Sequence, residues 1–65
     1  MRLQDIMAVM GACQKVEVFH MKKGRLFKGI NSDIRATKNG AYACLDNEVI
    51  SVYSDEYDRI HIIIQ

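Results

Sequence analysis

The C-terminal part of the chain has the most regular pattern. Residues 48–53 and 59–64 are two runs rich in β-branched and aromatic residues, and each run alternates in polarity. The polar, acidic stretch 54–58 separates them. Such runs favour strands, and the polar stretch between them favours a loop. We therefore predict a β-hairpin over residues 48–64.

A second hairpin is predicted nearer the N-terminus. Residues 15–21 and 25–30 both alternate between apolar and polar side chains. Gly24 lies between them and can supply the positive φ that a short hairpin turn requires.

The first residues predict a helix over roughly residues 2–10. Its apolar residues follow the spacing i, i+3, i+4 and i+7 and are Leu3, Ile6, Met7 and Met10. Gly11 follows at a position that suits a helix end. One apolar stripe of this kind is expected to cover one face of a sheet.

The middle of the chain is the least periodic. Asn31, Ser32 and Asp33 form a cap or turn signal, and Asn39-Gly40 is a turn dipeptide. Residues 42–45 are expected to form one short helical turn. The predicted fold class is α+β, with a short N-terminal helix packed on an antiparallel sheet of two β-hairpins, in one domain over residues 1–65. A curled, barrel-like sheet is the alternative.

A chain of 65 residues buries only about 60% of its unfolded surface, so that a disulfide, a metal or a partner chain usually adds stability. Cys13 and Cys44 do not resemble a secreted disulfide framework. No apolar signal segment is seen, and the longest isoleucine run, residues 62–64, is far too short to span a membrane. We expect a cytoplasmic protein with reduced thiols, in which oligomerisation supplies the extra stability.

The second hairpin contains apolar residues in both phases of the alternation. Ile50, Val52 and Ile63 are out of phase with a larger set, which comprises Val49, Ile60, Ile62 and Ile64. One short helix can cover only one of the two faces, and an exposed apolar face is unfavourable in a monomer. We therefore predict homodimerisation through the second face or through a strand edge.

No set of residues predicts catalysis or a resident cofactor. His20 and His61 are expected to be half-exposed strand residues, because their spacing from the two cysteines does not fit a zinc finger. The acidic loop 54–58 lacks the distal glutamate of a calcium loop, and no glycine-rich phosphate loop is present. The expectation is a binding protein that is not an enzyme.

The tip of the first hairpin is basic. It carries Lys22, Lys23, Arg25 and Lys28 beside Phe19 and Phe27. Cations beside aromatic rings can bind phosphate and stack a base, or they can dock on an acidic protein surface. A solvated turn is the alternative. Tyr42, Tyr53 and Tyr57 are candidates for a contact surface, or for ordinary packing at its rim.

The net charge of +1 argues against a dedicated nucleic-acid-binding protein, because few counterions would be released on binding. Direct DNA binding is therefore not expected.

The layout resembles very small proteins encoded by bacteriophages and prophages of Firmicutes. The similar features are a start with Leu3, Asp5 and Ile6, a strand with Val16 and Val18 before Gly24, and a closing hairpin. That hairpin carries Leu45, Val49, Ser51, Tyr53, Asp55, Ile60, Ile62 and Ile64. These motifs specify a fold and carry no catalytic residues. The resemblance implies stoichiometric binding, either to a host defence nuclease, as anti-CRISPR proteins do, or to a nucleotide second messenger, as sponge proteins do.

Three hypotheses follow. The first is a non-catalytic phage-type inhibitor that binds a bacterial defence protein, with Tyr53, Tyr57 and the basic tip as contacts. The second is an oligomeric sponge that sequesters a phosphorylated nucleotide, with Lys22, Lys23, Arg25 and Lys28 at the phosphates and aromatic rings such as Phe27 at the base. The third is a small structural or regulatory module of a mobile element.

Overall fold

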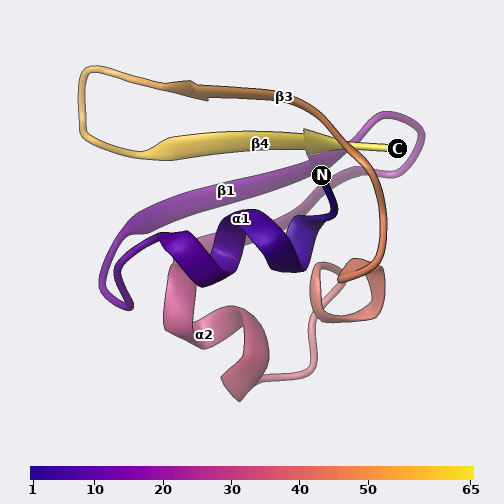
Figure 1. Ribbon diagram of the computed structural model, residues 1–65, viewed down its shortest axis with the longest axis horizontal. Helices are drawn as coiled ribbons and strands as arrows, with labels where there is room; N and C mark the ends of the chain where they lie inside the picture. Colours follow the sequence, from indigo (N-terminus) through magenta and orange to yellow (C-terminus); the bar gives the residue numbers. More distant parts are fainter.

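Four strands form one sheet in the order β2-β1-β4-β3, and two α-helices and a 3₁₀ helix accompany it (Figure 1). The computed structural model describes all 65 residues. The elements are α1 (Leu3–Val9), β1 (Lys15–His20), β2 (Gly24–Ile30), α2 (Asn31–Ala36), η1 (Tyr42–Cys44), β3 (Val49–Ser54) and β4 (Ile60–Ile64). The predicted α+β class, the N-terminal helix and the two hairpins are confirmed.

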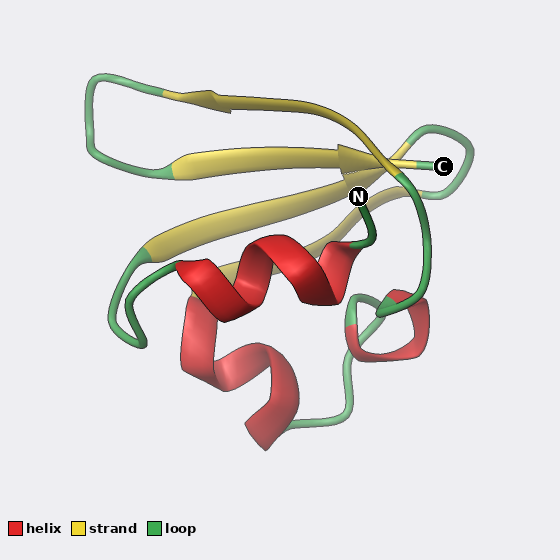
Figure 2. Cartoon of the chain, viewed as in Figure 1, coloured by secondary structure: helices red, strands yellow, loops and turns green.

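The junction between the two hairpins differs from the prediction of an antiparallel sheet. β1 pairs in parallel with β4, from Val16 opposite Ile60 to His20 opposite Ile64, so the sheet is mixed. Parallel neighbours need a long crossover connection. The chain supplies such a connection, because β2, α2, η1 and β3 follow β1 in the sequence before β4 begins (Figure 2). The C-terminal strand can therefore enter the middle of the sheet.

α1 begins where loop carbonyls can satisfy its first N–H groups. Leu3 N donates to Asn47 O and Gln4 N to Leu45 O, both at 2.9 Å. Such partners replace the intrahelical bonds that the first turn lacks. The helix has its C-cap at Met10, and Gly11 follows without a positive φ.

The turn of the first hairpin confirms the role of Gly24, whose φ is +83°. A bulge lies in this hairpin, because Val18 pairs with Phe27 whereas Phe19 pairs with Arg25. Leu26 is therefore the extra residue, and both Leu26 and Phe27 pack against the core. The simple alternation that placed these two side chains on opposite faces is wrong at this point.

The middle segment contains one predicted and one unpredicted helix. η1 is the expected short turn over residues 42–44. α2 has only six residues and buries a single apolar side chain, Ile34, so that it has no apolar stripe to be recognised. Its first residue is Asn31, which was expected to lie in a cap or turn. No helix of the chain is long and apolar enough to cross a membrane.

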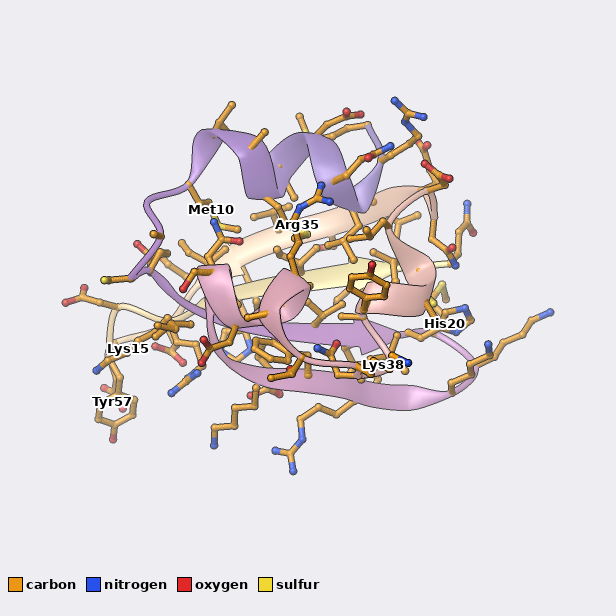
Figure 3. All side chains as sticks on the ribbon, turned by 90° about the horizontal axis from the view of Figure 1, so that it is seen from below. Met10, Lys15, His20, Arg35, Lys38 and Tyr57 are labelled. Atoms are coloured by element: carbon orange, nitrogen blue, oxygen red, sulfur yellow. The ribbon has the colours of Figure 1, made fainter.

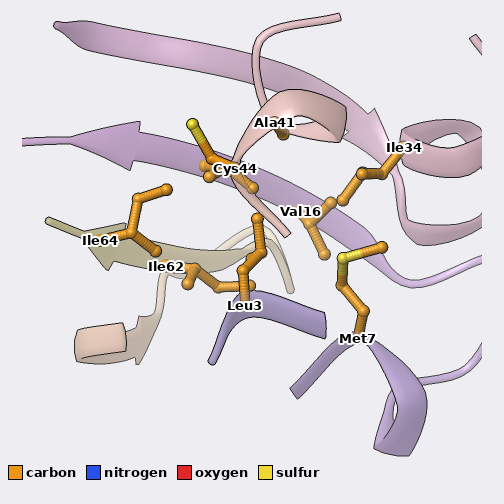
Figure 4. Packing of buried hydrophobic residues seen from close by; sticks show 9 residues of the cluster. Leu3, Met7, Val16, Ile34, Ala41, Cys44, Ile62 and Ile64 are labelled. Carbon is orange, nitrogen blue, oxygen red and sulfur yellow. The ribbon is translucent and has the colours of Figure 1, made fainter. Parts of the chain in front are cut away.

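The core lies between the helices and one face of the sheet (Figure 4). α1, α2 and η1 contribute Leu3, Met7, Ile34 and Cys44, and Ala41 lies directly before η1. β1 and β4 contribute Val16, Val18, Ile62 and Ile64. Cys44 is buried, Cys13 is exposed, and both are free thiols.

One buried amide connects α1 to α2. Asn31 is 7% exposed, and its Nδ2 donates to Met7 O at 2.9 Å and to Met10 O and Gly11 O at 3.3 Å. These carbonyls lie at the end of α1, where helical carbonyls lack partners. Asn31 Oδ1 is buried and has no hydrogen-bond partner. The side chain therefore caps α1 with its amide nitrogen alone.

Replacing Asn31 with alanine should lower the free energy of unfolding by about 1 to 3 kcal/mol, because buried carbonyls lose their donor. Urea denaturation monitored by circular dichroism measures this change. Ser32→Ala is the matched control, since Ser32 is the exposed neighbour. Equal stability of N31A and S32A would contradict the capping role.

Candidate binding face

The face of the sheet opposite the helices carries no packed element, and we name it the open face (Figure 1). Residues paired across neighbouring strands direct their side chains to the same face. The pairing therefore assigns to the open face Glu17, Phe19, Arg25, Lys28, Ser51, Tyr53, His61 and Ile63. They come from all four strands.

The centre of the open face is hollowed. The hollow has a volume of about 270 Å³ and is lined by Glu17, Phe19, Tyr53, His61 and Ile63. Phe19 is 43% exposed and Tyr53 is 52% exposed. Aromatic surface of this extent on a small domain is typical of a contact region.

Tyr53 is held in place by a chain of contacts. Its ring stacks on His61, with centroids 4.8 Å apart and an angle of 3° between the planes. His61 Nε2 lies 2.7 Å from Asp55 Oδ2. Asp55 Oδ1 accepts from the N–H groups of Tyr57, at 2.8 Å, and Arg59, at 3.1 Å. The β3–β4 loop thus fixes His61, and His61 supports Tyr53.

These contacts lower the pKa of Asp55 from its ordinary value of 3.8 to about 2. The hydrogen bond to His61 is the largest cause, and the N–H groups of Tyr57 and Arg59 add to it against the opposing effect of desolvation. Because the ionised carboxylate only accepts, His61 Nε2 is the donor of the pair. His61 Nδ1 has no partner within the chain and lies in a side chain that lines the hollow.

The Asp55 carboxylate should therefore stabilise the fold in a pH-dependent manner. A lowered pKa in the folded state gives stabilisation that is present above pH 3.8 and is lost as the pH falls through about 2. Thermal unfolding of D55N should show a lower Tm than the unchanged protein at neutral pH, and the two Tm values should converge toward pH 2. Glu56→Gln, in the same loop and exposed, is the control. A Tm difference for D55N that stays constant down to pH 2 would contradict this assignment.

One side of the open face is basic. Arg25 pairs with Phe19 and Lys28 pairs with Glu17, so both cations border the hollow. No ion pair holds either side chain, since the ion pairs of the chain involve only Met1, Arg2 and His61 as cations. Residues 15–30 contain five lysine or arginine residues and one glutamate, a net charge of +4. The net charge of +1 for the whole chain therefore conceals a strongly basic hairpin.

The structure places the predicted contact residues apart from one another. Arg25 and Lys28 on β2 and Tyr53 on β3 share the open face but lie on its opposite edge strands, and Lys22 and Lys23 lie in the exposed turn beyond β1. Tyr57 lies in the β3–β4 loop, is 70% exposed and projects away from the body of the molecule (Figure 3).

Phe27 requires a correction as a contact residue. It pairs with the buried Val18 and packs against the core, because the bulge at Leu26 turns it toward the helices. Phe19 is the phenylalanine that borders the cations on the open face.

His20 also differs from the half-exposed strand histidine that was expected. It is buried, and its Nδ1 accepts from Lys22 N at 3.0 Å and Lys23 N at 3.3 Å. The His20 ring therefore holds the β1–β2 turn, in which Lys22 and Lys23 lie.

The predicted self-association residues do not share one face. The register of β3 shifts between Val49 and Ser51, so that Val52 pairs with Ile62, whose side chain faces the core. Ile63 lies on the open face, opposite Ser51. Ile50 and Val52 are instead exposed along the outer strand of the sheet. The phase inferred from simple alternation is therefore wrong, and self-association remains a prediction that now concerns the edge of β3.

Self-association through the edge of β3 can be tested. β3 contains no charged residue and no proline that would discourage pairing with a second strand. We expect a concentration-dependent dimer in size-exclusion chromatography with light scattering, and a monomer for Val52→Lys. Val9→Lys is the control, since Val9 is 80% exposed on α1. A protein that stays monomeric at its highest attainable concentration would rule out pairing through β3.

Sequence reasoning missed Glu17, Asp55 and His61 as parts of one site. Glu17 and Phe19 share a phase within β1, which was visible in the sequence. Their position beside His61 and Ile63 depends on the parallel register of β1 and β4, for which the sequence offers no local signal.

The open face offers two exposed aromatic rings, a carboxylate, an imidazole nitrogen and two cations. No three His, Cys, Asp or Glu side chains lie close enough together to hold a metal ion. No protein-family model, curated protein or solved structure matches the chain.

Proposed function

We propose that the protein is a non-catalytic binding protein that counters a bacterial defence system by stoichiometric contact through its open face. The observation that carries this proposal is the one-sided packing of the sheet. Every buried apolar side chain belongs to the helical side, whereas Phe19 and Tyr53 remain exposed on the other. A small domain that leaves aromatic residues exposed beside unpaired cations gains from covering them with a partner.

Binding accounts for the arrangement around His61 better than catalysis does. Asp55 and the stacked Tyr53 hold the imidazole in a fixed orientation. A nucleophilic mechanism would need a serine or cysteine hydrogen-bonded to the remaining ring nitrogen. The contacts of His61 are with Asp55 and Tyr53, so we assign the Asp55–His61 pair the role of supporting the exposed ring of Tyr53.

The partner proposed first is a host defence protein. The resemblance of the sequence to small phage proteins supports such a target, as in inhibition of the anti-CRISPR kind. The basic side of the open face favours a partner with an acidic surface, because complementary charge speeds association and selects the partner. Self-association through β3 would place two open faces in one assembly.

Affinity capture from the lysate of a bacterial host tests the proposal. The tagged protein should retain a partner in stoichiometric amount, and Tyr53→Ala should lose it because an exposed aromatic anchor is removed. Tyr42→Ala is the matched control, since Tyr42 is an exposed tyrosine on η1.

Circular dichroism of both variants ensures that folded proteins are compared. Equal capture by Y53A and Y42A would contradict the use of the open face. Turnover of any captured molecule would contradict a non-catalytic role.

A further inference from the structure

We infer that the hollow of the open face binds one nucleoside phosphate, with its base between Phe19 and the His61 ring of the Tyr53–His61 stack and its phosphates at Arg25 and Lys28. This inference rests on the proposed use of the open face and gives the chemical class of what the hollow recognises. It is carried by the residues that line the hollow and by those that border it.

The walls of the hollow suit a planar ring. His61 lies on β4, between β1 and β3, and its stack on Tyr53 fixes its ring as a flat surface at little cost in side-chain entropy. Phe19 lies on β1, the strand next to β4, and faces this stack from the other side of the hollow. The volume of the hollow, about 270 Å³, accommodates a single base rather than a large ligand.

The polar atoms in the hollow favour guanine. The Glu17 carboxylate is a pure acceptor, and guanine presents two neighbouring donors, its ring N–H and its amino group, on one edge. Adenine and cytosine place an acceptor beside their amino group, and uracil places carbonyl oxygens beside its N–H. A carboxylate meets repulsion from these neighbouring acceptors. His61 Nδ1 adds a second polar atom from the adjacent strand.

The cations lie where phosphates would leave the hollow. Arg25 is the strand neighbour of Phe19, and Lys28 is the strand neighbour of Glu17. Both are exposed, and no carboxylate of the chain is ion-paired with them. Arginine can bind phosphate through two parallel hydrogen bonds, and lysine adds a point charge. Lys22 and Lys23 extend the basic surface beyond β2.

Isothermal titration calorimetry with GTP, ATP, CTP and UTP tests the inference, with inorganic triphosphate as a probe for charge alone. GTP should bind at least tenfold more tightly than UTP and than inorganic triphosphate. Glu17→Gln should reduce the preference for GTP, because the amide presents a donor as well as an acceptor. Phe19→Ala should weaken binding of all four nucleotides.

The phosphate contacts have a matched control. Arg25→Gln and Lys28→Gln should each weaken GTP binding roughly tenfold, in keeping with the loss of a charge-assisted hydrogen bond. Arg35→Gln should leave it unchanged, because Arg35 is an exposed arginine on α2, on the helical side (Figure 3). Circular dichroism shows whether each variant is folded.

Three results would overturn the inference: no heat of binding with any nucleotide, equal affinity for GTP and inorganic triphosphate, or the same loss for R35Q as for R25Q. If nucleotides fail to bind but Tyr53→Ala still abolishes capture of a host protein, only the nucleotide assignment is wrong. If neither nucleotides nor capture depend on the open face, the proposed function is wrong as well.

Discussion

The parallel pairing of β1 with β4 is the contact on which the rest of the molecule depends. On one side of this pair, Val18 and Ile62 form the floor against which α1 and α2 pack. On the other side, the same register places Glu17 beside His61 and Phe19 beside Ile63. The core and the hollow are therefore two faces of one strand pair. A change in this register would disturb both of them together, because side chains in a strand alternate between the faces.

Local patterns in the sequence were sufficient for the elements whose structure is locally determined. The stripe of Leu3 and Met7 predicted α1, and Gly24 predicted the first turn. α2 was missed because Ile34 is its only buried apolar residue, and helices of that kind are stabilised by tertiary packing rather than by their own pattern. Bulges were the other source of error. An extra residue at Leu26 and at Ile50 changed which side chains faced the core, and alternation alone cannot reveal an insertion.

The candidate site was predictable only in part for a related reason. The cations and Tyr53 were predicted from residue type alone, since charged and aromatic side chains can form binding contacts in any fold. The grouping of Glu17 with His61 required knowledge of which strands are neighbours, and those residues are 44 positions apart in the sequence. The support that Asp55 gives to Tyr53 through His61 is likewise a property of the folded chain. Residue types thus indicated which side chains could bind a ligand or a partner, and the strand order determined which of them lie together.

The position of β4 also bears on how the chain is made. β4 is the last strand in the sequence, yet it lies between β1 and β3 in the sheet. A growing chain that has not reached residues 60–64 can form only the β1–β2 hairpin, and an isolated two-stranded hairpin is marginal in water. Until β4 has been synthesised, β3 therefore has no strand to pair with, and the apolar residues of α1 have no complete sheet to pack on. Synthesis therefore supplies an interior strand of this sheet after both of its neighbours, β1 and β3.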